Sequence, residues 1–215
     1  MKWSFKLARF FGIDVYVHQT FFLLLLFFAW QGYSFENSLA DAANGVVFIC
    51  ALFACVVLHE YGHALMARRF GIKTQHITLL PIGGVASMEK MPEKPSQELL
   101  VALAGPAVNF VIAALLYIWL QLNPQTLTYD SLQNGNIPLT LQLLVVNLFL
   151  AIFNLIPAFP MDGGRVLRAL FAMKMPYATA TDWASKIGKG FAIAFAIYGV
   201  YSGNLLLTLI AMFLW

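Results

Sequence analysis

All 13 lysines and arginines of this 215-residue chain fall into three segments that are separated by apolar sequence. These segments are residues 2–9, 68–94 and 165–189, whereas the polar loops 31–44 and 123–138 contain acids and no base. Because basic residues gather on the cytoplasmic side of membrane proteins, this segregation predicts a chain that crosses a membrane several times. The composition agrees, since 60% of the residues are hydrophobic and 11% are charged.

Six apolar runs alternate with the polar segments, at residues 20–30, 44–67, 99–122, 139–156, 190–200 and 205–215. A span needs about 20 residues, so the first, fifth and sixth runs need flanking residues to cross. We predict an all-α, multi-pass protein of the cell membrane with about six transmembrane helices and both termini in the cytoplasm. The last run is short for a span, which indicates a helix that is cut short or anchored elsewhere.

Short β elements are expected near the cytoplasmic face. Residues 13–18 alternate like a strand, and residues 75–90 resemble two short strands joined at 81–84. No repeat or flexible linker divides the chain, so we expect one membrane domain over residues 1–215. The net charge is only +3, which gives no support to nucleic-acid binding and leaves the lipid bilayer as the expected surroundings.

The second apolar run contains the motif HEYGH. The uncharged sequence before it, residues 45–58, has 14 residues and is too short to cross a bilayer, so the helix must continue through the motif. His59 and His63 then lie about 8 to 14 Å from Arg68 toward the bilayer centre. At this spacing both imidazoles share one helix face and can hold one Zn²⁺, while Glu60 can activate water. The alternative is a pair of packed histidines with Glu60 paired to a cation.

A catalytic zinc site of this type needs a third protein ligand. Asp41 and Asp130 are expected on the external side, His76 falls in the predicted hairpin, and Glu89, Glu93 and Glu98 lie among lysines and are expected to be solvated. The candidate is Asp162, which follows the helix-breaking Pro157 and Pro160 and precedes two glycines that permit a tight turn. Asp162 could instead cap the next helix or pair with Arg165.

The motifs HEYGH at residues 59–63 and NLIPAFPMDGG at residues 154–164 resemble the site-2 protease family of intramembrane zinc metalloproteases, in particular its archaeal and bacterial branch. The resemblance extends to residues 5–21, 79–88 and 104–110. It implies that Asp162 is the third zinc ligand. It also implies hydrolysis of peptide bonds within transmembrane segments of single-pass membrane protein substrates, that is, regulated intramembrane proteolysis.

Further polar and glycine residues are candidates for substrate binding. Asn109 and Asn154 could bind the backbone of an unwound substrate, although hydrogen bonds between helices would also explain them. Gly83 and Gly84 could offer an open strand edge for an extended substrate. The sequence leaves two rival functions open, a membrane metal transporter and a non-catalytic zinc-binding scaffold. No repeated halves are evident, which disfavours the transporter.

Overall fold

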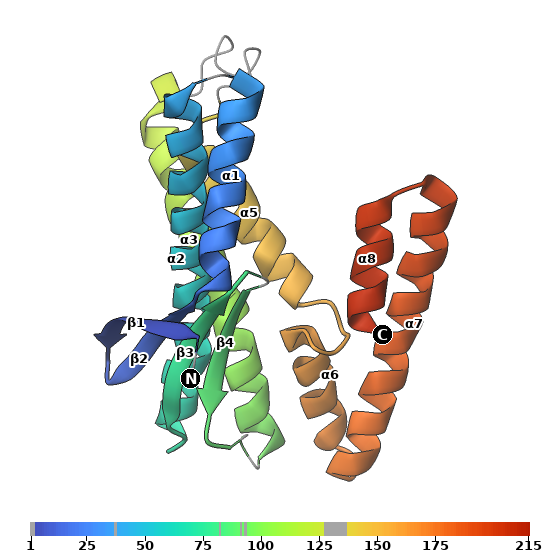
Figure 1. Ribbon diagram of the computed structural model, residues 1–215. Helices are drawn as coiled ribbons and strands as arrows, with labels where there is room; N and C mark the ends of the chain where they lie inside the picture. Colours follow the sequence, from blue (N-terminus) through green and yellow to red (C-terminus); the bar gives the residue numbers. More distant parts are fainter. Residues whose placement is uncertain (1–2, 37, 82, 91, 93, 127–136) are drawn as a thin grey trace.

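The structure is a computed structural model that describes residues 3–215 except 37, 82, 91, 93 and 127–136. Asp130 and Glu93 therefore lie outside the described residues. Figure 1 shows a group of long helices above a small sheet, with a separate hairpin of two helices beside them. The elements are β1 (Ser4–Phe10), β2 (Ile13–His18), α1 (Thr20–Glu36), α2 (Leu39–Arg69), β3 (Thr74–Leu80), β4 (Gly83–Met88), α3 (Pro95–Leu122), η1 (Pro124–Thr126), α5 (Leu139–Asn154), α6 (Asp162–Ala172), α7 (Tyr177–Ser202) and α8 (Leu205–Leu214).

The expectation of about six transmembrane helices is met in part. All six apolar runs fall mainly or wholly on helices, but among the described residues only α2, with 31 residues, and α3, with 28, are long and apolar enough to cross a membrane. Helices α1, α5 and α8 are apolar but shorter. Helix α7 has 26 residues, yet its first half carries Asp182, Lys186 and Lys189. The chain is thus mostly helical with two candidate spans.

The chain is not all-α, because four strands form one mixed sheet in the order β1-β2-β3-β4. Strands β1 and β2 are antiparallel, β2 and β3 are parallel, and β3 and β4 are antiparallel. The alternation expected at residues 13–18 is present, since Ile13 and Val15 are buried on the face toward α2. These two residues form a core cluster with Ile77 of β3 and with Tyr61 and Ala64 of α2. The sheet therefore packs directly on the helix that carries the histidines.

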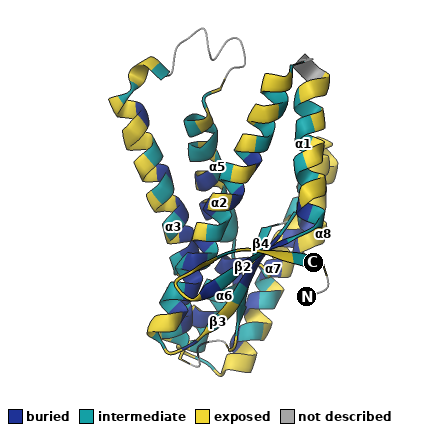
Figure 2. Cartoon of the chain, turned by 60° about the vertical axis from the view of Figure 1, so that its left-hand side comes forward, coloured by how far each residue is buried: buried dark blue, intermediate teal, exposed yellow. Residues whose placement is uncertain are grey.

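Helices α2 and α3 approach closely because small residues line their contact. A Cβ atom added at Gly62 would lie 2.6 Å from the carbonyl oxygen of Ala104, so α3 leaves no room for a side chain there. Figure 2 shows exposed residues along the outer sides of the helices and buried residues where the helices meet each other and the sheet. The close contact brings the backbone of α3 against the two histidines.

A buried ion pair joins α3 to α6. Glu98, expected to be solvated, is only 2% exposed, and Arg168 Nε donates to its Oε1 atom at 2.9 Å. The Arg168 guanidinium also lies over the rings of Phe159 and Tyr177, at 5.2 and 5.1 Å from their centroids. The expectation for Glu98 was wrong because sequence neighbours did not reveal that α6 and α7 would cover it. This pair fixes α6, and with it Asp162, against α3.

Breaking this ion pair from one side should cost more than removing both charges. Arg168→Met leaves the buried Glu98 carboxylate without its cation and should destabilise the protein by about 3 to 5 kcal/mol. The double variant Glu98→Leu/Arg168→Met removes the uncompensated charge and should recover most of that loss. Thermal unfolding in detergent micelles measures both, and a double variant at least as unstable as Arg168→Met would contradict the prediction.

Candidate metal centre

Two helices bring three ligand atoms to one point. His59 and His63 lie one turn apart on α2, and Asp162 is the first residue of α6. The Asp162 Oδ2 atom lies 3.2 Å from His59 Nε2 and 3.1 Å from His63 Nε2, and the two Nε2 atoms are 3.1 Å apart. All three residues are buried, at 7% exposure or less. Among the described residues, these three form the one group of potential metal-ligating side chains close enough together to hold a metal ion.

The dimensions and chemistry of this cluster fit zinc. Tetrahedral zinc with bonds of about 2.0 to 2.1 Å to nitrogen and oxygen places neighbouring ligands about 3.3 Å apart, close to the observed separations. Two imidazoles and one carboxylate are a ligand set that zinc accepts. Three protein ligands leave a fourth position open, as catalytic rather than structural zinc sites do.

A chain of hydrogen bonds fixes which nitrogen His59 presents. The Leu143 carbonyl can only accept, so Asn147 donates to it through Nδ2 at 2.8 Å and accepts through Oδ1. Asn109 Nδ2 donates to that oxygen at 2.8 Å, which leaves Asn109 Oδ1 to accept from His59 Nδ1. The proton on Nδ1 leaves the His59 Nε2 lone pair directed at the centre. Asn109 is thus buried behind a ligand and does not line the cavity, unlike a residue that binds substrate directly.

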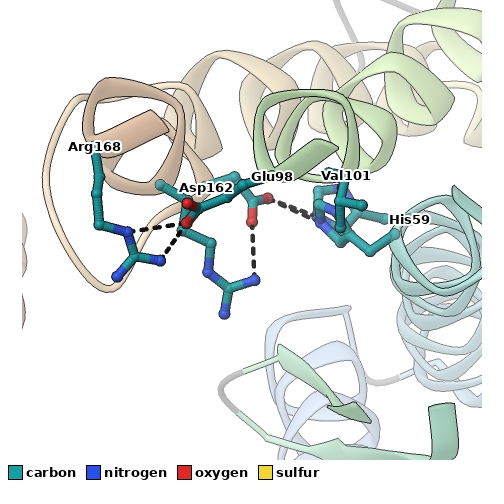
Figure 3. A network of polar contacts seen from close by, with 7 residues as sticks. His59, Glu98, Val101, Asp162 and Arg168 are labelled. Atoms are coloured by element: carbon teal, nitrogen blue, oxygen red, sulfur yellow. Dashed lines mark hydrogen bonds and ion pairs between the residues drawn. The ribbon is translucent and has the colours of Figure 1, made fainter. Parts of the chain in front are cut away.

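His63 is oriented in the same way by backbone. Its Nδ1 atom donates to the carbonyl oxygen of Val101 on α3 at 2.7 Å, and a carbonyl can only accept. The His63 Nε2 atom therefore also presents its lone pair to the centre. Figure 3 shows His59, Val101 and Asp162 at the centre, with the ion pair between Glu98 of α3 and Arg168 of α6 close by.

The Asp162 carboxylate lies against the Nε2 atoms of His59 and His63. Because both Nε2 atoms present lone pairs, these separations suit three ligands of one cation and not hydrogen bonds. Its side chain makes no helix cap, since Met161 occupies the N-cap position and no side-chain cap bond forms. Arg165 Nη1 lies 3.9 Å from Oδ1, so that pairing exists beside the contacts with the histidines. The alternative of a simple capping role is thereby removed.

The sequence predicts a tight turn at Gly163 and Gly164. In the structure these glycines instead allow close packing. Both residues lie in the first turn of α6, where a Cβ at Gly163 would overlap the carbonyl oxygens of Leu155 and Ile156. A Cβ at Gly164 would lie 2.8 Å from the carbonyl carbon of Ala158. The two glycines let α6 begin directly under the broken chain after α5, and this places Asp162.

A cavity of about 410 Å³ opens beside the three ligand atoms. Glu60 lines it, as do Asn154 at the end of α5 and Gly83 and Gly84 of β4. A Cβ at Gly84 would lie 2.8 Å from Glu60 Cγ, so the strand passes directly over the glutamate. Most of the remaining wall is apolar: Val56, Val85, Ala86, Met88, Leu150, Phe153, Pro160, Met161 and Phe213.

Two residues of the site were not identified as functional from the sequence. Arg165 is the one lysine or arginine among the described residues that line the cavity. The sequence indicated only its pairing with Asp162. Its spacing of three residues from Asp162 on one helix could have revealed it. Gly105 lies against both imidazoles, and no local pattern signals this contact because it forms between α2 and α3.

His59 and His63 on a long apolar helix, Asp162 supplied by α6, and Glu60 facing a largely apolar cavity match the His-Glu-x-x-His pattern of metallopeptidases. The pattern of peptidase family M50 matches residues 47–134 and 125–195. The chain belongs to this family, which confirms the resemblance found in the motifs.

Individual relatives agree. The chain is 42% identical, over all 215 of its residues, to a zinc metalloprotease of Methanocaldococcus jannaschii. It is 35% identical, in an alignment that covers 93% of this chain, to a Synechocystis protein with the provisional name of a zinc metalloprotease. It spans 59% and 54% of the lengths of these relatives. The solved structure of the site-2 protease from Methanocaldococcus jannaschii matches 99% of this chain and 92% of that chain, with 39% identity and a TM-score of 0.68.

Loss of a ligand should lower the metal content. Wild-type protein is expected to hold about one Zn²⁺ per chain, and Asp162→Ala removes one of three protein ligands. Metal analysis of the purified variant should therefore show a clear fall in zinc, as should His59→Ala and His63→Ala. Full zinc content in Asp162→Ala would remove this carboxylate from the ligand set.

A methyl group at Gly105 should disturb the centre without removing a ligand. An added Cβ would overlap the His63 imidazole and lie 2.7 Å from His59 Nε2. Gly105→Ala should therefore lower zinc affinity, measured by competition with a chelator. The matched control is Gly190→Ala on α7, where an added Cβ meets nothing within 4 Å and zinc affinity should stay unchanged. Equal affinity in the two variants would show that the contact is not restrictive.

Proposed function

We propose that this protein is an intramembrane zinc metallopeptidase that hydrolyses peptide bonds within transmembrane segments of membrane-anchored proteins, as in regulated intramembrane proteolysis. The proposal is carried by one observation, the convergence of His59, His63 and Asp162 beside a cavity that Glu60 also lines. The family membership and the names of the relatives support the reaction type.

The reaction follows from this geometry. His59, His63 and Asp162 would hold the zinc ion, which when bound would lower the pKa of a water molecule toward neutrality and polarise the substrate carbonyl. Glu60 directly follows His59 in the helix and lines the cavity, so its carboxylate can accept the proton of the attacking water. As the new C–O bond forms and the C–N bond breaks, Glu60 returns that proton to the leaving amine. The products are a carboxylate and an amine.

Arg165 supplies positive charge to the same step. It lines the cavity within 3.9 Å of Asp162, and its side chain is 30% exposed, so it can reach a bound peptide. Negative charge develops on the carbonyl oxygen during attack, and a guanidinium can donate hydrogen bonds to it. The same group can hold the carboxylate of the product.

The substrate is presented as an extended strand. Strand β4 pairs with β3 alone within the described sheet, so its other edge, which borders the cavity, offers backbone groups for strand addition. Gly83 has a φ of 137°, which favours glycine, and Gly84 keeps the strand close to Glu60. The Asn154 carboxamide can both donate to and accept from a peptide backbone. These three residues are our candidates for substrate binding, and Asn109 acts through His59.

The cell membrane is the proposed location of the whole chain as one domain, residues 1–215, with both termini in the cytoplasm. Helix α1 carries large apolar side chains on its outer side, and Leu23, Leu26 and Trp30 are each 65% exposed. Such apolar surface on a water-soluble protein would need a cover, and lipid provides one. About six crossings account for the segregation of the basic residues.

A transporter or a zinc-binding scaffold would use the same ligands without needing a base. Glu60 lines the cavity but is not one of the three clustered ligand residues, which favours catalysis over both. The rivals therefore predict that Glu60 is dispensable, and the peptidase predicts that it is essential.

Substitution of the base tests the proposal. Glu60→Gln keeps the size of the side chain but cannot accept a proton, so cleavage of a single-span reporter in proteoliposomes should fall by about 10²-fold or more. Zinc content should remain near one per chain. The control Glu89→Gln changes an exposed glutamate and should leave cleavage unchanged. Zinc flux into vesicles without cleavage by the wild-type protein would favour the transporter.

A further inference from the structure

The β1–β2 hairpin exposes an unusual set of apolar side chains outside the candidate spans. Their exposed fractions lie between 58% and 70%, and the residues are Trp3, Phe5, Leu7, Phe10 and Phe11. Single exposed apolar residues are ordinary, but five large ones within nine positions form a patch that needs a partner. Nothing in the proposed reaction uses this patch.

The hairpin has one apolar face and one charged face. Residues opposite each other on paired strands share a face, and Phe5 pairs with Val17 while Phe10 pairs with Ile13. Val17 and Ile13 are buried on the side of the sheet that faces the helices. The exposed rings of β1 therefore face the same side as the helices, at the sheet edge that the helices do not cover. Figure 1 shows this hairpin extending sideways from the helices.

The apolar face continues onto α1. The ring of Phe5 packs edge-to-face on Phe22 in the first turn of α1, with centroids 6.4 Å apart. Phe22 is itself 49% exposed and begins the row of outward apolar residues on that helix. The surface that would contact lipid on α1 thus runs without a break onto β1.

The opposite face carries charge. Lys6 and Arg9 of β1 both contact Asp14 of β2, at 2.7 and 3.4 Å, and their side chains remain 47% and 64% exposed. Tyr16, opposite Lys6, lies on this face with them. The hairpin is therefore amphipathic across its thickness, with its polar face directed away from the helices.

The tip of the hairpin is fixed to the lower end of α2. The hydroxyl group of Tyr61 lies 3.2 Å from the Phe10 carbonyl and 3.3 Å from the Ile13 carbonyl, and Arg68 Nη1 donates to the Phe11 carbonyl at 3.1 Å. The hairpin thus lies beside the last turns of α2, where apolar residues give way to Arg68 and Arg69. In a membrane helix this change marks the boundary between hydrocarbon and headgroups.

We propose that the β1–β2 hairpin is a membrane-surface anchor that lies in the headgroup layer of the cytoplasmic leaflet, with its apolar face toward the acyl chains. Three structural observations favour lipid as the partner. The apolar patch continues the outer surface of α1, and it lies level with Arg68 and Arg69 of α2. The polar face of the hairpin is turned to the other side. Basic side chains beside an apolar face are typical of such interfacial elements.

This anchor would set the depth of the catalytic centre, an extension that rests on the proposed function. Tyr61 directly follows Glu60, so the hairpin is tied to the helix turn that carries the base and the metal ligands. A helix rises 1.5 Å per residue, so a small change in the depth of the enzyme changes which substrate peptide bond reaches Glu60.

Spin labels on neighbouring residues of β1 test the anchor. Single cysteines at Phe5 or Phe10, on the apolar face, and at Lys6 or Arg9, on the charged face, are labelled in a Cys50→Ser/Cys55→Ala background in phospholipid vesicles. Labels at Phe5 and Phe10 should collide more with oxygen, which concentrates in lipid, and labels at Lys6 and Arg9 more with a water-soluble nickel chelate. Equal chelate access on both faces would place the hairpin in water and overturn the proposal.

A second copy of the chain could cover the same patch. In that case labels at Phe5 would show strong spin–spin coupling between copies and low access to both oxygen and chelate, and the lipid proposal would be wrong. These measurements need no cleavage, so they stand even if the protein proves not to be a peptidase.

The effect on depth is measured with the active enzyme. Phe5→Ser/Phe10→Ser should move the cleavage position in a single-span reporter by one or more residues, read by mass spectrometry of the products, while zinc content stays unchanged. An unchanged cleavage position would show that the hairpin does not determine which substrate bond is cut. Absence of cleavage by the wild-type protein would instead contradict the proposed function and leave the spin-label result intact.

Discussion

The structure depends on placing three polar ligands inside an apolar layer of helices. Buried imidazoles and a buried carboxylate cost free energy unless each polar atom has a partner. His59 and His63 each use one ring nitrogen on α3, through Asn109 and the Val101 carbonyl, and turn the other toward Asp162. The packing of α2 and α6 on α3 therefore also offsets the free-energy cost of burying these three polar side chains. A zinc ion would supply the remaining partner for all three ligand atoms.

Glycine and amide residues make this arrangement possible in two different ways. Gly62 and Gly105 let α3 approach α2 so closely that no side chain fits between them, and Asn109 and Asn147 use the same contact to carry a hydrogen-bond chain to a backbone carbonyl of α5. Because that carbonyl can only accept, the direction of the whole chain is fixed, and with it the tautomer of His59. Asn109 thus serves the contact between helices and the orientation of His59 at once, which supports the expected hydrogen bonds between helices.

The centre is also tied to the periphery of the fold. Arg168 and Glu98 hold α6, and therefore Asp162, against α3, while Tyr61 holds the β1–β2 hairpin against the helix turn that carries Glu60. The first contact governs whether the ligand set is complete. The second relates the centre to the surface on which the hairpin lies. A substrate strand added to β4 would lie beside Gly84, which contacts Glu60.

Local sequence determined the features that depend on neighbours along the chain. The spacing of His59, Glu60 and His63 fixed a shared helix face, the motif at residues 154–164 marked Asp162 within a family, and alternation at residues 13–18 gave β2. Tertiary structure alone decided the contacts between distant segments: the burial of Glu98, the place of Asn109 behind His59, the cavity position of Arg165, and the pairing that makes residues 4–10 a strand. The alternation in strand β1 is interrupted by a register shift between Lys6 and Ala8, which brings Phe5 and Phe10 to one face although they are five residues apart. Periodicity records which face a residue shares, whereas the partner on that face is chosen only when helices and strands pack.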